Sequence, residues 1–204
     1  MKNMVRSLQI VFLIVLFSGC SLTTSIPPVS KYLLDVKIKT LGSTQSCFSD
    51  KVLRMGQMES PIILSGRSIY YRVDGGQSYR YTKSRWMEAA PQQLTNLMMI
   101  SVTKTKLFKD VIPFRSLAKN DLILESSLYH FTQTIHSDGM STLHVAMKVR
   151  LVEQYSRKII ASKLFELSKD NVEGDVEGAI AGYSELSTQL LDDINEWLQK
   201  SCTP

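Results

Sequence analysis

Three long segments in the second half of the chain alternate between apolar and polar side chains, and this pattern restricts the fold more than any other feature. The segments cover residues 122–135, 142–153 and 158–167. In the middle segment five apolar side chains point one way: Leu143, Val145, Met147, Val149 and Leu151. His144, Lys148 and Arg150 point the other way, as in a strand with one buried face. Turn sequences at 137–139 and 155–157 separate the segments, so they are predicted to form an antiparallel meander.

Two amphipathic segments are predicted to be helices. One begins near Pro91, since proline suits a first helical position, and its buried face comprises Leu94, Leu97, Met98, Ser101 and Thr105. The other covers residues 176–200 and carries an apolar stripe made of Ile180, Tyr183, Ser187, Leu190, Leu191, Ile194, Trp197 and Leu198. Gly178 and Gly182, at its start, favour close packing of this helix on the sheet. The predicted class is α+β: an antiparallel β-sheet with two helices packed on one face.

The first half of the chain supplies shorter extended segments. Residues 32–38 alternate between apolar and charged side chains and are predicted to form a half-buried strand. Residues 51–57 are predicted to contain a further short strand, and residues 108–114 an extended return after the first helix. Residues 69–73 and 78–82 are predicted to form a hairpin, because the Asp74-Gly75-Gly76 sequence between them tolerates the positive φ angles of a tight turn.

Aromatic and basic residues gather in and beside this hairpin. The candidate partner surface comprises Tyr70, Tyr71, Arg72, Tyr79, Tyr81, Arg85 and Trp86. Tyrosine and arginine are enriched where proteins bind one another. Cross-strand aromatic pairs that stabilise the hairpin explain the tyrosines equally well, so both interpretations stay open.

The N-terminus has the layout of a secretory signal. Lys2 and Arg6 precede an apolar run at residues 8–17, and the small residues Ser18 and Gly19 lead to Cys20. About ten apolar residues make a helix of roughly 15 Å, too short for a bilayer core of about 30 Å. The sequence 17–20 resembles the lipobox of bacterial lipoproteins, in which the leader is removed and the cysteine is acylated, although Phe17 replaces the usual aliphatic residue. An uncleaved anchor, or an ordinary signal followed by a coincidental cysteine, is the alternative.

These features divide the chain into three parts. Residues 1–19 are the expected lipoprotein signal peptide, residues 20–30 the lipidated Cys20 and a tether, and residues 31–204 a single folded domain. Several acyl chains hold a protein stably at a membrane, whereas one chain does not. By resemblance to the sorting of enteric lipoproteins, Ser21 favours the periplasmic face of the outer membrane, and inner-membrane anchoring stays open.

Charge and cysteine content narrow the function further. Removal of residues 1–19 would leave 22 basic and 19 acidic residues without a long basic run, which gives no case for nucleic-acid binding. Cys47 and Cys202 remain besides Cys20. In an oxidising compartment they either pair in a disulfide or stay as two separate thiols, and the sequence leaves this open.

Motifs for catalysis are missing from the sequence. There is no phosphate-binding glycine loop, no His-Glu-x-x-His and no Gly-x-Ser-x-Gly. His130, His136 and His144 are the only histidines, and no carboxylate or cysteine stands at ligand spacing from them. The sequence therefore predicts no enzyme, no cofactor and no metal site.

The mature chain resembles the ABC-type transport auxiliary lipoprotein family, which includes the PqiC-like lipoproteins. The resemblance covers residues 32–198 and rests on segments 31–34, 69–72, 79–86, 107–111, 128–133, 158–165 and 196–198. One departure is His130, which stands before Phe131 where the family leads us to expect an acidic residue.

The resemblance implies a non-catalytic component of an envelope transport system. Its expected partners are an MCE-domain protein and an ABC permease and ATPase, which together move lipids or other hydrophobic molecules between membranes. A structural or assembly lipoprotein of the outer membrane is the alternative. The cargo, the partner-binding surface, the source organism and whether the chain forms a homo-oligomer are left open.

Overall fold

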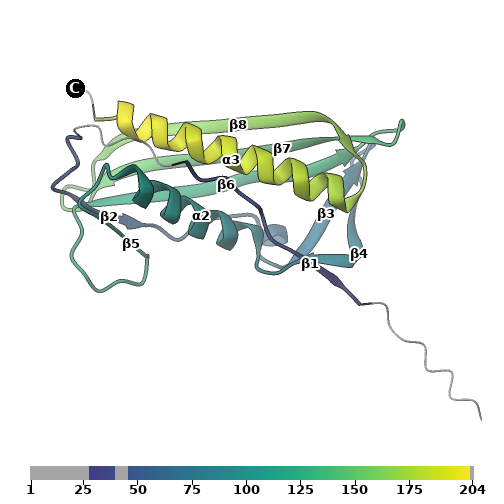
Figure 1. The fold of residues 1–204 in the computed structure, drawn as a ribbon, viewed down its shortest axis with the longest axis horizontal. Helices are drawn as coiled ribbons and strands as arrows, with labels where there is room; N and C mark the ends of the chain where they lie inside the picture. The colour runs from purple at the N-terminus through teal and green to yellow at the C-terminus, as the bar shows by residue number, and fades with distance from the viewer. Residues whose placement is uncertain (1–27, 40–45, 203–204) are drawn as a thin grey trace, which may run out of the picture.

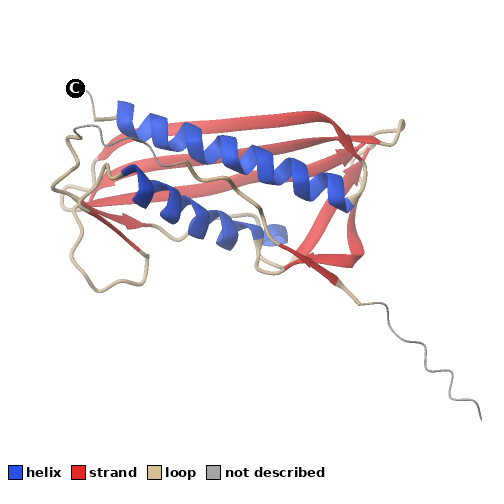
Figure 2. Ribbon diagram, in the orientation of Figure 1, coloured by secondary structure: helices blue, strands red, loops and turns tan. Residues whose placement is uncertain are grey.

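The structure is a computed structural model that describes residues 28–39 and 46–202. In this part of the chain an open β-sheet is covered on one face by two helices, as Figures 1 and 2 show. The expected signal peptide, Cys20 and most of the tether lie outside the described residues. Neither helix is long and apolar enough to cross a bilayer.

Three long strands form the main part of the sheet. They are β6 (Leu122–Ile135), β7 (Met140–Glu153) and β8 (Ile159–Glu173), and both β6–β7 and β7–β8 pair antiparallel. The predicted meander is therefore confirmed. β8 extends six residues beyond its expected end because Glu173 pairs with Met140 at the start of β7. The five inward side chains predicted for β7 are at most 1% exposed.

Shorter strands complete the sheet along the other edge of β6. They are β1 (Ser30–Tyr32), β2 (Val52–Met55), β3 (Ser68–Val73), β4 (Ser78–Trp86) and β5 (Asp110–Ile112). β2 and β3 lie end to end beside β6, and both run parallel to it. β4 pairs antiparallel with β3, whereas β1 pairs parallel with β4 and β5 with β2. The α+β class is confirmed, but the sheet is mixed, because these short strands reach their partners from distant parts of the chain.

Helices α2 (Ala90–Thr105) and α3 (Val176–Lys200) match the expected segments and pack on the same face. Asp175 caps α3, since its carboxylate accepts a hydrogen bond of 2.8 Å from the Gly178 amide. A Cβ atom at Gly182 would lie 2.4 Å from Leu143 Cδ1, so glycine lets α3 approach β7 closely, as predicted. Buried Asn195 of α3 donates a hydrogen bond of 2.7 Å to Ser101 of α2 and joins the helices.

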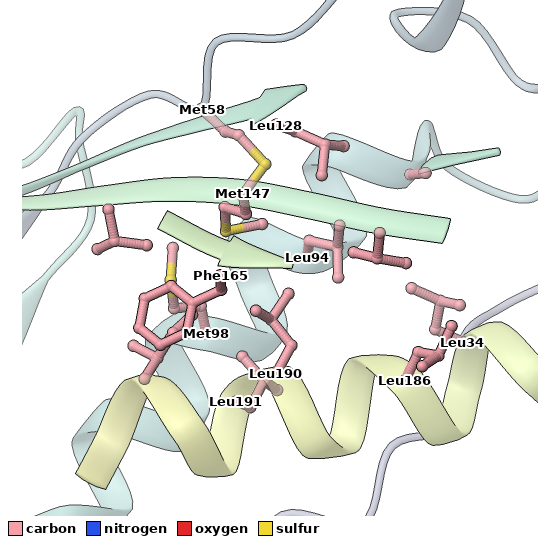
Figure 3. Close-up of a cluster of buried hydrophobic side chains, with 14 of the residues drawn as sticks. Leu34, Met58, Leu94, Met98, Leu128, Met147, Phe165, Leu186, Leu190 and Leu191 are labelled. Carbon is pink, nitrogen blue, oxygen red and sulfur yellow. The ribbon is translucent and has the colours of Figure 1, made fainter. Parts of the chain in front are cut away.

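A single cluster of buried side chains connects the helices to the sheet. Figure 3 shows Leu186, Leu190 and Leu191 pointing from α3 toward the sheet, where Phe165 and Met147 lie. Burial of such side chains contributes about 1.5–3 kcal/mol each, so this layer is the main source of stability.

The expected strand at residues 32–38 needs a correction. Only residues 30–32 pair with the sheet, as β1. Beyond Tyr32 the chain stays extended, and its exposure alternates as predicted, but it lies along α3 instead of beside another strand. Alternation reports that one side of a segment is buried and does not identify what covers it.

Candidate partner-binding surface

The segment 33–39 is held by hydroxyl groups of α3. The amide of Asp35 donates to Ser184 Oγ at 3.0 Å, and the amide of Lys37 donates to Thr188 Oγ1 at 3.3 Å. These two hydroxyls are four residues apart on α3, and each donates in turn to the helix carbonyl four residues earlier. The spacing matches because alternate amides of an extended chain and residues i and i+4 of a helix both recur about every 6 Å.

A groove of about 780 Å³ follows the line of contact between residues 32–39 and α3. We call it the α3 groove. Apolar Ile180 and Ala181 contribute to its lining. Carboxylates outnumber ammonium groups along it: the charged lining residues are Asp35, Lys37, Lys39, Glu177, Glu185, Asp192 and Asp193. Lys39 and Asp192 neutralise each other in an ion pair of 2.5 Å, and Glu185 pairs with Lys169. Asp35, Glu177 and Asp193 then outnumber the remaining Lys37. The groove is therefore an acidic surface with a partly apolar lining.

Three of the predicted hairpin tyrosines form a row near the start of α3. The ring of Tyr71 lies 5.6 Å from that of Tyr79 and 4.8 Å from that of Tyr81. The Tyr81 hydroxyl donates to Gln133 Oε1 at 3.0 Å, and Gln133 donates to the Asp175 carbonyl at 3.3 Å. Tyr79 is 46% exposed, whereas Tyr71 and Tyr81 are half-buried, so the row pairs across the hairpin and presents its Tyr79 end to solvent.

The tyrosine row and the α3 groove approach one another at the first turn of α3. The Tyr32 hydroxyl donates to Glu177 Oε1 at 2.9 Å, and both residues line the groove. Asp175, one residue before α3, receives the hydrogen bond from Gln133 that connects it to Tyr81. An aromatic patch thus leads into an acidic groove, although the groove had no signal in the sequence beyond the alternation at residues 32–38.

The remaining residues of the predicted surface lie elsewhere. Tyr70 and Arg72 alternate with Tyr71 along β3 and so point to the opposite face of the sheet. The Arg85 Nε atom is buried and has no hydrogen-bond partner among the described residues. Trp86 is 3% exposed and packs 6.1 Å from the ring of Phe131. The indole of Trp86 therefore belongs to the core and not to an exposed surface.

The structure also shows where the cysteines and histidines named in the sequence analysis lie. Cys47 and Cys202 are joined in a disulfide with Cα atoms 5.5 Å apart, which ties the segment after residue 45 to the end of α3. The rings of His130 and His144 stack 5.0 Å apart, while His136 contacts Asp74 at 3.0 Å. Within residues 28–39 and 46–202, no three His, Cys, Asp or Glu side chains converge as metal ligands.

The phenol of Tyr81 is expected to ionise at a higher pH than an ordinary tyrosine. Burial, reinforced by the nearby Tyr71 and Asp175, raises the pKa of Tyr81 to about 12, while the hydrogen bond to Gln133 opposes this shift. In the unfolded chain a tyrosine has a pKa near 10, so below pH 10 the phenol is neutral in both states and its contribution to stability is fully present. Above pH 10 the unfolded chain ionises first, and this contribution is lost as pH rises toward 12. Absorbance titration of the native protein minus that of Tyr81→Phe should show one phenol with a midpoint near pH 12. A midpoint near 10 would contradict the described burial.

The mixed sheet and its two covering helices define a two-layer α+β domain. The model of the family described as the ABC-type transport auxiliary lipoprotein component matches residues 32–195, so this chain belongs to that family. The resemblance predicted from the sequence is thereby confirmed. The chain is thus a member of a lipoprotein family whose role is auxiliary to ABC-type transport.

Two solved structures share the fold. A protein of Xanthomonas campestris, XCC0632, assigned to family DUF330, is 14% identical, with a TM-score of 0.74 over 85% of this chain and 96% of that one. An uncharacterised protein is 16% identical, with a TM-score of 0.63 over 84% of this chain and 99% of that one. No curated protein sequence matches this chain. At these identities the structures support the fold alone.

Proposed function

We propose that this protein is the non-catalytic auxiliary lipoprotein of an ABC transport system that includes an MCE-domain protein and moves lipids or other hydrophobic molecules across the envelope. The observation that carries the proposal is the family match over residues 32–195, which spans most of the sheet, α2 and most of α3. The protein binds the MCE-domain partner from the periplasmic face of the outer membrane and performs no chemical step itself.

Anchoring depends on Cys20 in this proposal. Replacement of Cys20 by alanine removes the thiol that would carry the lipid, so we expect labelling with radioactive palmitate to be abolished and the leader of residues 1–19 to be retained. Wild-type protein and a Cys47→Ala, Cys202→Ala variant serve as controls and should both be labelled. Normal leader removal in Cys20→Ala would indicate an ordinary signal peptide instead.

The tyrosine row and the α3 groove are the surface that we assign to the partner. An exposed aromatic patch supplies apolar contact area, and an acidic groove attracts a partner segment that carries lysine or arginine side chains. The partner's cationic segment would lie along α3, and its neighbouring apolar residues would cover Tyr71 and Tyr79.

Co-purification tests this assignment. Full-length protein recovered from detergent-solubilised envelope should bring the MCE-domain protein with it. Tyr79→Ala should lower that recovery by about tenfold, since aromatic residues at binding hot spots contribute more than 1.4 kcal/mol. Tyr155→Ala is the matched control, because Tyr155 is also exposed (75%) but lies in the distant β7–β8 turn.

Two outcomes would redirect the proposal. Equal losses in both tyrosine variants, or no loss in either, would move the binding surface away from the tyrosine row. Enrichment of a different partner, with altered outer-membrane protein or lipopolysaccharide levels and normal lipid trafficking in the deletion strain, would favour a structural or assembly lipoprotein. A gene neighbourhood that encodes a permease, an ATPase and an MCE-domain protein would support transport.

A further inference from the structure

Two loops on one side of the domain expose apolar side chains to solvent. The first contains the 3₁₀ helix η1 (Ile62–Leu64), in which Ile62 is 91% exposed. The second follows β5 and carries Phe114, 50% exposed, and Leu117, which is fully exposed. Exposed apolar side chains that gather in one place commonly mark a site of interaction, whereas single ones do not.

The two loops are neighbours in space. Ser60 and Ser65, on either side of η1, line the same groove of about 530 Å³ as Pro113, Phe114 and Arg115 of the second loop. The second loop is held in place, because Arg54 Nη2 donates a hydrogen bond of 2.6 Å to the Ala118 carbonyl. We call these residues, 60–66 and 113–119, the apolar loop edge.

Cations surround the apolar side chains of this edge. Arg67 follows the first loop, and Arg115 and Lys119 lie on the second, all of them exposed. Carboxylates also lie beside the loops and keep their negative charge: Glu59 accepts from Ser127 at 3.1 Å, Asp121 accepts from the Val52 amide at 2.8 Å, and Asp110 is exposed at the start of β5. The cations that lie on or directly after the loops themselves are Arg67, Arg115 and Lys119. Apolar tips flanked by lysine and arginine are complementary to an anionic lipid surface, which offers an acyl boundary beneath negative head groups.

The entry point of the chain lies on the same side of the molecule. Figure 1 shows the loop after β5 toward one end of a long side and β1, where the chain enters, toward the other end of that side, while β8 lies along the opposite side. Pro28 lies only eight positions after Cys20, so the two residues are at most about 29 Å apart when the chain is extended. A lipid on Cys20 would therefore hold the apolar loop edge near the bilayer at a high effective concentration, so weak contacts suffice to orient the domain.

We propose that the apolar loop edge rests on the anionic lipid surface to which the protein is anchored, with Ile62, Phe114 and Leu117 inserted among the head groups. The domain then lies with β8 turned away from the bilayer. This proposal rests on the lipid anchor of the proposed function, but it is independent of the transport partner.

Fluorescent labelling of the lipidated full-length protein tests the contact. Leu117→Cys is labelled with the polarity-sensitive probe NBD under non-reducing conditions, and the protein is reconstituted into vesicles of phosphatidylethanolamine and phosphatidylglycerol. Ser168→Cys is the matched control, since Ser168 is exposed on β8. We expect a blue-shifted emission that spin-labelled lipids quench for the probe at 117, and water-like, unquenched emission at 168. Replacement of phosphatidylglycerol by phosphatidylcholine should reduce the quenching at 117.

The possible results distinguish a failure of the membrane contact from a failure of the lipid anchor. Protein that floats with the vesicles but has a water-like probe at 117 overturns the membrane contact and leaves the anchor intact. Protein that does not float overturns the anchor, and a water-like probe in the same sample overturns the contact as well. A blue shift at 117 without quenching by spin-labelled lipids means that protein covers the loops, which also overturns the proposal.

Discussion

Replacement of Tyr183 by alanine is expected to lower the free energy of unfolding by about 3–5 kcal/mol, the range for removing a large buried aromatic side chain. Tyr183 is 1% exposed and lies where α3 meets the sheet. Its ring stacks 4.1 Å from that of Phe131 and lies 6.3 Å from that of Trp86. Alanine would leave a cavity between the two layers that the meander, closely packed against α3 at Gly182, has little freedom to fill.

The matched control is Tyr183→Phe, which keeps the ring and removes the hydroxyl. That hydroxyl is buried without a hydrogen-bond partner among the described residues, and burial raises the pKa of the phenol well above its usual range. An unpaired buried hydroxyl costs about 1–3 kcal/mol, so Tyr183→Phe should leave stability unchanged or increase it. Urea denaturation of the three proteins measures the difference. A large loss in Tyr183→Phe would mean that the hydroxyl has a partner and that the described packing is wrong there.

The elements with long, regular periodicity were predictable from the sequence. Helix α3 begins and ends at the expected residues because its apolar stripe continues for seven turns and faces one sheet. The β6–β7–β8 meander was equally clear, since short turns restrict each strand to its neighbour in sequence.

The pairings of the short strands could not be predicted in this way. Leu53 of β2 pairs with Leu122 of β6, nearly seventy residues further on, and a four-residue strand carries no pattern that selects such a partner. Residues 33–39 show the same difficulty, because the hydroxyls of Ser184 and Thr188 replace a neighbouring strand as hydrogen-bond acceptors. Which strand pairs with which over such distances is decided by packing in the core and not by the local sequence.

The positions of the hairpin side chains were predicted only in part for a related reason. The alternation of a regular hairpin places Tyr71, Tyr79 and Tyr81 on one face, and they do form a row. The register between β3 and β4 shifts between Ser68 and Tyr70, however, so the hairpin pattern does not extend to Arg85 and Trp86. Trp86, which was included in the candidate partner surface, consequently lies in the core.

The Cys47–Cys202 disulfide should be the other large contribution to stability. It joins residues 155 positions apart and so closes a loop that contains almost the whole described domain. Closing a loop of this length reduces the entropy of the unfolded chain enough to contribute about 5 kcal/mol in the chain-entropy model, and removal of native disulfides commonly costs about 2–5 kcal/mol. The bond also holds the segment that carries Phe48, whose ring stacks 5.3 Å from that of Phe108.

Chemical denaturation with and without a thiol reductant tests this contribution. We expect the reductant to lower the unfolding midpoint of the native protein, and the double variant Cys47→Ser, Cys202→Ser to have the lower midpoint in both conditions. The double variant thus controls for effects of the reductant that do not involve this bond. If the native protein instead shows two free thiols at these positions by mass spectrometry, the loop is open and the entropic argument does not apply. If the bond is present but its reduction leaves the midpoint unchanged, residual structure in the unfolded chain already keeps these two segments together.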